Sequence, residues 1–300
     1  MTERASAAIG PGTAVHGMPE PAGPTRIGPQ VFDWGSRTYV MGILNVTPDS
    51  FSGDGLLAAG NDPVDAAVVQ GRRMVDEGAD LLDVGGESTR PGHDEVAAAD
   101  ELARVVPVVA ALRAALPDTP LSIDTTKPSV AAAALDAGAD LLNDVWGVAP
   151  ANDMLRLAAE RDAPIVLMHN RAEARYTNLM AEILADLHAA IDRALAAGVA
   201  WEAIVVDPGF GFGKTAEHNL ALLRDLGLLR ALGRPILLGT SRKSTLGKVL
   251  DLDADERLEA TLATTALGIA AGVDLVRVHD VRPNVRAARM TDAIVRGGPS

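Results

Sequence analysis

The chain has no cysteine and few aromatic residues. The absence of cysteine from its 300 residues excludes disulfide bonds, thiol nucleophiles and cysteine metal sites, and it is typical of a reducing compartment. Aromatic residues make up only 3% of the sequence, so alanine, valine and leucine must form most of the core. The chain is nevertheless 48% hydrophobic and 22% charged, which indicates a folded globular protein. We expect it to be cytoplasmic.

A surplus of positive charge and a long apolar run are also missing. The 27 basic residues are outnumbered by 40 acidic residues, which gives a net charge of -13 and argues against a nucleic-acid partner. The longest uncharged stretch, residues 261–273, is too short and too rich in alanine and threonine to span a membrane. Residues 1–10 have no apolar centre, so we expect no signal peptide. We expect no nucleic acid and no membrane among its partners, whereas an anionic small ligand stays open, because a few clustered lysines and arginines can dominate one cleft.

Glycine and proline are concentrated at the start of the chain. They make up ten of residues 1–30, and we predict that this segment is a disordered tail in front of a single domain over residues 31–300. Residues 31–34, a turn at Gly35 and Ser36, and residues 37–44 are expected to form a β-hairpin that leads into a buried strand.

Short apolar runs then alternate with segments of helical character. The eight runs are residues 40–44, 81–84, 121–123, 141–142, 165–168, 204–206, 236–238 and 275–278. The helical segments are residues 63–77, 96–115, 129–137, 152–160, 181–197, 216–223 and 256–271. Apolar runs of this length, separated by helices, predict a parallel sheet that is buried on both faces.

A weak internal repeat supports this division into units. Residues 78–83 (GADLLD), 138–143 (GADLLN) and 272–277 (GVDLVR) share one pattern, in which a glycine follows a helix and precedes a strand. Each glycine suits a left-handed helix cap. Eight strands, eight helices and roughly 250 residues predict an α/β fold of the (β/α)8 TIM-barrel type. A doubly wound open sheet is the alternative, but the first strand is not followed by its glycine-rich turn.

Polar side chains follow each of the eight apolar runs, where a barrel of this type builds its active site. Asp124, Asn143 and Asp207 follow the third, fourth and sixth runs, and Lys243 follows the seventh. Polar groups that are buried together need partners. A flat heterocycle with several ring N–H donors and one carbonyl group would satisfy all four, so we predict a site for such a ring.

Basic residues gather at the same predicted mouth of an otherwise acidic protein. They are Arg90, Lys243, Arg277 and His279, and they predict a local site for a phosphate or diphosphate. Asn45, at the end of the first run, offers a hard oxygen to Mg²⁺, which takes one or two protein ligands plus substrate phosphates. Mg²⁺ is therefore the expected cofactor.

Several of these residues also have ordinary structural explanations. A single aspartate at a strand end commonly caps the next helix, which suits Asp83, Asp144 and Asp280 equally well. A position among solvated surface charges suits Arg90, Lys127 and Lys214. Residues 208–215 (PGFGFGKT) resemble a Walker A loop, but Pro208 replaces the first required glycine. The six histidines show no metal-binding spacing, and no serine has the setting of a nucleophile.

Six segments of the sequence together resemble the dihydropteroate synthases, which are pterin-binding TIM-barrel enzymes. They are residues 41–52 (MGILNVTPDSFS), 83–92 (DVGGESTRPG), 122–125 (SIDT), 207–214 (DPGFGFGK), 241–244 (SRKS) and 277–281 (RVHDV). They occur in the family's order over roughly four fifths of the chain. The resemblance implies an enzyme that joins 6-hydroxymethyl-7,8-dihydropterin diphosphate to p-aminobenzoate and releases diphosphate, and it implies inhibition by sulfonamides.

The resemblance also implies roles for individual residues. The implied pterin ligands are Asp124, Asn143, Asp207 and Lys243. The implied diphosphate ligands are Thr89, Arg277 and His279, with Asn45 on Mg²⁺. The p-aminobenzoate pocket would be formed by Phe51, Pro91, Lys243 and Ser244, with Phe212 nearby, and Arg90 and Met168 complete the expected substrate-binding set. The expected catalytic residues are Asp49, Lys243, Arg277 and His279.

Bond breaking should lead in this reaction, because an aniline nitrogen is a modest nucleophile. Arg277, His279, Mg²⁺ and amides at helix ends would stabilise the departing charge. Asp49 would balance the cationic carbon and help to receive the amine proton. The family resemblance further implies a homodimer through the last helices.

Other functions stay open at this level. A methyltetrahydrofolate:corrinoid methyltransferase shares the pterin-binding barrel, although it would not need the segments 89–91 and 241–244. A catalytically silent paralogue is a second alternative, because residues 52–55 are Ser-Gly-Asp-Gly where the family usually has Ser-Asp-Gly-Gly. A Schiff-base lyase that uses Lys243 is a remote third.

Overall fold

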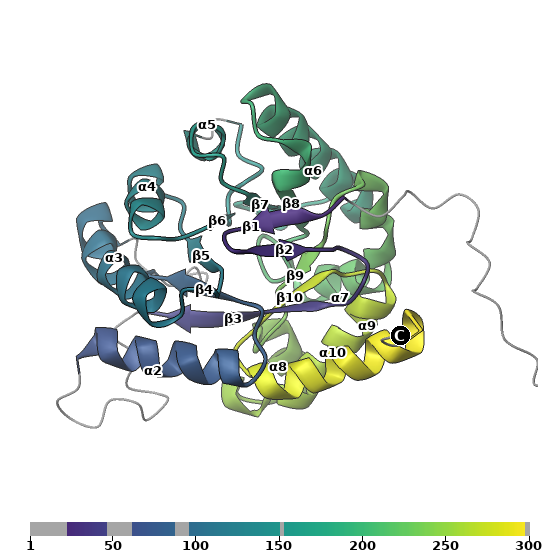
Figure 1. Ribbon diagram of the computed structural model, residues 1–300. Helices are drawn as coiled ribbons and strands as arrows, with labels where there is room; N and C mark the ends of the chain where they lie inside the picture. The colour runs from purple at the N-terminus through teal and green to yellow at the C-terminus, as the bar shows by residue number, and fades with distance from the viewer. Residues whose placement is uncertain (1–22, 47–61, 88–95, 151–152, 298–300) are drawn as a thin grey trace, which may run out of the picture.

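The computed structural model describes residues 23–46, 62–87, 96–150 and 153–297 of the chain. Within them, eight parallel strands follow one another around a ring in the order β8-β7-β6-β5-β4-β3-β10-β9 (Figure 1). The strands are β3 (Tyr39–Asn45), β4 (Leu81–Gly85), β5 (Leu121–Asp124), β6 (Leu141–Asp144), β7 (Ile165–Met168), β8 (Ile204–Asp207), β9 (Leu237–Leu238) and β10 (Leu275–Val278). A parallel bridge between Val206 and Ile236 joins β8 to the start of β9. The predicted (β/α)8 barrel is confirmed, and the open sheet is excluded.

Helices surround the ring of strands. They are α2 (Pro63–Asp76), α3 (Ala98–Ala115), α4 (Pro128–Asp136), α5 (Asp153–Glu160), α6 (Leu179–Ala196), α7 (Ala216–Arg224), α8 (Ser244–Leu250), α9 (Leu258–Ala270) and α10 (Val281–Val295). The described residues also form the short 3₁₀ helices η1 (Trp201–Ala203), η2 (Leu226–Leu232) and η3 (Ala254–Glu256). None of these helices in the described part of the chain is long and apolar enough to cross a membrane.

The ends of these helices follow from local sequence signals. The side chain of Asp62 accepts a hydrogen bond from Val64 N and caps α2, whose first residue is a proline. The helix ends at Asp76, and Gly78, two residues further on, has a φ of +103°. Gly138 and Gly272 occupy the equivalent positions in the repeat, with φ values of +112° and +101°. The left-handed helix caps predicted from the repeat are confirmed, and they allow each helix to turn back into the next strand.

The N-terminal hairpin begins earlier than the sequence predicts. Strands β1 (Thr25–Ile27) and β2 (Gln30–Phe32) pair antiparallel around Gly28, which has a φ of +53°. The predicted pairing across Gly35 and Ser36 is reduced to an isolated bridge. The boundary of the predicted tail at residue 30 is therefore wrong, because burial of Ile27 and Phe32 holds both strands in place. Residues 1–22 lie outside the described residues.

The hairpin covers the amino-terminal end of the barrel. Ile27, Phe32 and Trp34 pack into one buried cluster with inward-facing residues of the barrel strands. Figure 1 shows β1 and β2 drawn across the ring of strands. Phe32 and Trp34 stack with ring centroids 5.4 Å apart. A second, larger cluster lies between the strands and the helices. Some of the few aromatic residues thus close the amino-terminal end of the barrel. The carboxyl end of the barrel stays available for an active site.

Candidate active site

Strand periodicity explains how polar side chains enter the barrel. Successive side chains on a strand point to opposite faces, so residues two apart share a face. Leu81, Leu141, Val205 and Leu275 face the cluster under the hairpin. The residues two positions further on are Asp83, Asn143, Asp207 and Arg277. These four polar side chains therefore enter the same interior above the apolar layer.

Arg277 links two carboxylates inside the barrel. Its Nε atom donates to Asp83 Oδ2 at 2.6 Å, and its Nη2 atom donates to Asp124 Oδ2 at 2.7 Å. Asn143 Nδ2 donates to the same Asp83 oxygen at 3.0 Å, so its Oδ1 atom faces away from Asp83 as an acceptor. Asp83 is fully buried and serves as the anchor of this cluster. The alternative explanation of Asp83 as a helix cap is wrong.

Several buried oxygen atoms of this cluster lack partners. Asp83 Oδ1, Ser122 Oγ and Asp124 Oδ1 make no hydrogen bond within the described residues. Burial raises the pKa of Asp124 to about 7, although Arg277 opposes this shift. Burial also acts to lower the pKa of Arg277, but attraction to Asp83 and Asp124 outweighs it and raises the pKa. Unpartnered buried acceptors need donors, which a ligand with several N–H groups would supply.

Asp207 and Lys243 lie close to this cluster. Asp207 Oδ1 accepts a hydrogen bond from Gly209 N at 2.7 Å. Burial raises the pKa of Asp207 to about 6, while Gly209 N and Lys243 act in the opposite direction. The Lys243 Nζ atom lies 3.9 Å from the centre of the Phe212 ring, in a cation–π contact. The four predicted ring ligands therefore gather around one interior, and their roles stay predictions.

His279 and Ser241 form a pair beside Arg277. The backbone N–H of His279 donates to Ser241 Oγ at 3.1 Å, and the same Oγ lies 3.0 Å from His279 Nδ1. Because Ser241 Oγ already accepts from the backbone, its hydroxyl proton is available to donate to Nδ1. This pairing is compatible with a neutral imidazole whose proton is on Nε2, where it would donate to an anion.

The loop before α8 holds Lys243 and Ser244 at the start of that helix. Lys243 is the N-cap residue of α8 and Ser244 is its first residue. Arg242 has a φ of +57°, which is uncommon for a residue with a side chain. Its guanidinium group forms an ion pair with Asp280 at 2.7 Å. Its backbone is held by two hydrogen bonds, from Arg242 N to Thr261 Oγ1 at 3.3 Å and from Arg257 Nη1 to Arg242 O at 3.0 Å.

Asn45 lies at the end of β3, paired in register with Gly85. A Cβ atom added at Gly85 would lie 3.8 Å from both Asn45 Oδ1 and Asp124 Oδ2, so the amide is beside the cluster. The described residues contain no group of three histidine, aspartate or glutamate residues that would hold a metal ion by itself. A single amide oxygen fits Mg²⁺ that a substrate phosphate also binds.

Met168 is the last residue of β7. It is buried and lies in register with Asp207 of β8.

The sequence allows two lysines, Lys127 and Lys214, to be solvated surface charges, but in the structure their ammonium groups contact other protein groups. Lys127 forms ion pairs with Glu87 at 2.5 Å and with the fully buried Glu101 at 2.7 Å. Lys214 donates to two backbone carbonyl groups of its own loop, Gly209 O and Phe212 O, at 3.0 Å each. The surface explanation is therefore wrong for both lysines. Lys214 is turned into its loop, in contrast to the lysine of a Walker A motif.

Five predicted site residues cannot be placed. Asp49, Phe51, Thr89, Arg90 and Pro91 belong to the loops after β3 and β4 and lie outside the described residues. Their predicted roles stay predictions.

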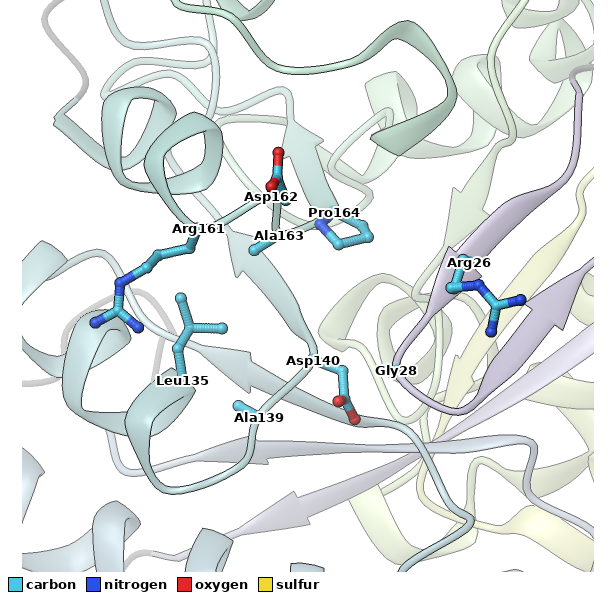
Figure 2. A pocket seen from close by; sticks show the side chains of 9 residues that line it. All are labelled: Arg26, Gly28, Leu135, Ala139, Asp140, Arg161, Asp162, Ala163 and Pro164. Carbon is cyan, nitrogen blue, oxygen red and sulfur yellow. The ribbon is translucent and has the colours of Figure 1, made fainter.

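A separate cavity of about 360 Å³ lies at the amino-terminal end of the barrel, beside the turn of the hairpin. Its lining includes Gly28, Asp140 and Pro164 (Figure 2). Arg26 and Arg161 lie on opposite sides of it, and Arg161 is paired with Asp136 at 2.7 Å. This cavity shares no residue with the polar cluster at the carboxyl ends of the strands.

The polar interior lies at the carboxyl end of a (β/α)8 barrel, and some of its buried oxygen atoms lack hydrogen-bond partners among the described residues. This arrangement is typical of enzymes that act on small molecules. Residues 41–279 match the family model described as pterin binding enzyme. The chain belongs to this pterin binding enzyme family.

Within the family, the chain is similar to dihydropteroate synthases. It is 52% identical over 272 residues to the dihydropteroate synthase of Clostridium beijerinckii, covering 90% of this chain and 99% of the relative. The structure of the Clostridium difficile dihydropteroate synthase in the presence of pteroic acid has a TM-score of 0.84 and 52% identity, covering 88% of this chain and 99% of that one. The Xanthomonas albilineans enzyme with 4-aminobenzoic acid has a TM-score of 0.86 and 40% identity, covering 93% of this chain and all of that one.

Proposed function

We propose that this chain has dihydropteroate synthase activity. It joins 6-hydroxymethyl-7,8-dihydropterin diphosphate to p-aminobenzoate and releases 7,8-dihydropteroate and diphosphate. The observation that carries the proposal is the buried cluster of Asp83, Asp124, Asn143 and Arg277, in which carboxylate oxygens lack donors. The relatives at 46–52% identity with the same activity support it.

The polar interior suits the pterin ring because the ring carries several N–H donors on one edge. Asp124 Oδ1, Asn143 Oδ1 and the second oxygen of Asp207 are the acceptors for these donors. Lys243 meets a ring acceptor, and the ring of Phe212 steadies its ammonium group at 3.9 Å. Met168 contributes an apolar wall.

The diphosphate lies at the mouth of the barrel in this proposal. Arg277 and Arg90 supply positive charge to it, and Thr89 and the Nε2–H group of His279 donate hydrogen bonds. The bond between the pterin methylene carbon and the diphosphate oxygen breaks first, and its electron pair leaves with diphosphate. The aniline nitrogen then bonds to the electron-poor carbon and loses a proton, which Asp49 helps to receive.

The substrate that carries the amine occupies the outer part of the site. Phe51, Pro91, Lys243 and Ser244 form the p-aminobenzoate pocket, and sulfonamides compete for it. The Yersinia pestis dihydropteroate synthase, at 39% identity, has been solved as a sulfonamide drug complex.

Mg²⁺ is the cofactor in this proposal, with Asn45 as its protein ligand. When bound, the ion supplies positive charge to the diphosphate leaving group. The half-buried amide of Asn45 lies beside Asp124, which fits a site with one protein oxygen and substrate phosphates.

We also propose that the protein is a cytoplasmic homodimer. Leu267 of α9 and Met290 and Ile294 of α10 are between 63% and 70% exposed, and a second copy would cover them. Sedimentation should give twice the mass of the chain, and a single chain mass would refute the dimer.

The activity is tested by incubating the protein with the pterin diphosphate, p-aminobenzoate and Mg²⁺. Dihydropteroate and diphosphate should form in equal amounts, and the exposed-lysine variant Lys248→Met should match the wild type. Pterin binding without any product would favour a catalytically silent paralogue. Binding of methyltetrahydrofolate without binding of p-aminobenzoate would favour a corrinoid methyltransferase.

A further inference from the structure

The loop after β8 contains a lysine whose ammonium group points back into the protein. Lys214 Nζ lies 3.0 Å from Gly209 O, 3.0 Å from Phe212 O and 2.9 Å from His169 Nδ1. The first two contacts close residues 208–214 into a compact loop. The third contact fastens that loop to the end of β7, where His169 is fully buried. One ammonium group has three protons, which matches these three acceptors.

The state of His169 follows from its second neighbour. His169 Nε2 lies 3.2 Å from Asp186 Oδ2 on α6, and the same oxygen accepts from Arg171 Nη2 at 2.8 Å. A carboxylate held by Arg171 accepts hydrogen bonds, so the imidazole proton is on Nε2. Burial and the nearby Lys214 lower the pKa of His169 to about 3, which keeps the ring neutral. His169 Nδ1 is therefore an acceptor, and Lys214 is its donor.

The loop that Lys214 closes carries two contacts to the proposed pterin ligands. Gly209 N donates to Asp207 Oδ1 at 2.7 Å, while Gly209 O accepts from Lys214. Phe212 O also accepts from Lys214, and the Phe212 ring lies under the ammonium group of Lys243. Lys214 thus binds the carbonyl groups of the two residues, Gly209 and Phe212, that contact Asp207 and Lys243.

The loop is also packed so closely that its shape depends on these contacts. Gly209 has a φ of +68°, and a Cβ atom added there would overlap the carbonyl oxygen of His169. A Cβ atom added at Gly211, which has a φ of +84°, would lie 3.1 Å from the side chain of Lys243. The backbone of the loop therefore lies directly against His169 and Lys243.

Resting on the function proposed above, we propose that Lys214 is a positioning residue for the pterin site. Its ammonium group holds the loop of residues 208–214 against His169 and thereby orients the Asp207 carboxylate and the Lys243 ammonium group toward the ring.

Two variants and a matched control test this proposal. Lys214→Met removes the three donors but keeps a chain of similar length, and Lys214→Arg keeps a charge with several donors. Lys248→Met removes an exposed lysine from α8 and should behave as the wild type. Binding of the pterin diphosphate is measured by calorimetry at pH 6.5, below the pKa of Lys214, which burial lowers to about 7. Thermal unfolding shows whether each variant is folded.

We expect Lys214→Met to weaken pterin binding at least tenfold and Lys214→Arg to recover part of the loss. Folded Lys214→Met that binds the pterin within twofold of the wild type would overturn the proposal. The wild type is measured first, because its failure to bind the pterin would refute the proposed function rather than this inference alone.

A second measurement needs no variant. The ¹⁵N signals of the His169 ring in the wild-type protein report which nitrogen carries the proton. We expect protonated Nε2 and unprotonated Nδ1 in the folded protein, with Nδ1 shifted by the Lys214 donor. A proton on Nδ1 would overturn the proposal, because Lys214 would have no acceptor there.

Discussion

Replacing Asp207 with asparagine should weaken pterin binding and stabilise the protein. Asp207 Oδ1 is bound to Gly209 N, so the second oxygen is the group that faces ring donors. In asparagine, the group at this position is either an uncharged oxygen or an NH2 group. The uncharged oxygen is a weaker acceptor, and the NH2 group would face the ring donors with another donor. A hydrogen bond to a charged group contributes about 1.5–3 kcal/mol, so the dissociation constant should rise roughly tenfold to a hundredfold.

The stability of this variant follows from the pKa of the carboxyl group. Burial raises the pKa of Asp207 from 3.8 to about 6, so ionising it costs the folded wild type about 3 kcal/mol at pH 8. This cost decreases as the pH falls below about 6 and is absent well below pH 3.8, where Asp207 is protonated in the folded and the unfolded state. Asp207→Asn is neutral at every pH. Its free energy of unfolding should therefore exceed that of the wild type by up to about 3 kcal/mol at pH 8 and by little at pH 4.

Calorimetry with the pterin diphosphate and urea unfolding at both pH values measure these two effects. Lys248→Met provides the control for a change of charge on the surface. A dissociation constant within twofold of the wild type would refute the assignment of Asp207 to the ring. A variant that is less stable than the wild type at pH 8 would refute the argument from burial.

Three further predictions concern the same interior. Pterin binding by the wild type should weaken as the pH falls from 7 to 5. Burial raises the pKa of Asp124 to about 7 and that of Asp207 to about 6, so both carboxylates lose their charges in this range. An affinity that does not change with pH would contradict this. Arg277→Ala should lower the free energy of unfolding by about 3–5 kcal/mol, because it removes the guanidinium group that forms ion pairs with the buried Asp83 and Asp124. Adding Asp83→Asn should recover part of this loss in urea unfolding, and no recovery would refute the pairing. Gly209→Ala should lower the free energy of unfolding by more than about 1 kcal/mol in the same assay. Gly209 has a positive φ, and the added Cβ atom would overlap the carbonyl oxygen of His169. Equal stability of the variant and the wild type would show that the loop can move.

Local patterns were sufficient to predict the barrel and its units. All eight predicted apolar runs are strands, because a strand buried on both faces needs a short continuous apolar segment. Gly78, Gly138 and Gly272 have the positive φ values that the repeat predicts, since only the local backbone decides this property. The hairpin was placed too late because the burial of Ile27 depends on the inward layer of the whole barrel.

The sequence was sufficient to predict which residues form the candidate site, but not which hydrogen bonds and ion pairs join them. Asp124, Asn143, Asp207 and Lys243 follow strands, and parallel strands bring their carboxyl ends together. Asp83 lies within β4, and in the sequence a helix cap explains it equally well, because the sequence does not show that Arg277 lies beside it. The two-residue spacing from Leu81 was the available signal.

The order of apolar runs, glycines and strand-end polar residues along the chain already specifies a barrel with a polar mouth, because these features depend on near neighbours. Pairings between distant residues depend on how the ring of strands closes. Arg277 meets Asp83 across 194 positions, and Lys214 meets His169 across 45. Whether a charged side chain faces water or another charge is therefore settled by packing, and in this protein packing makes Asp83 an anchor and turns Lys214 inward.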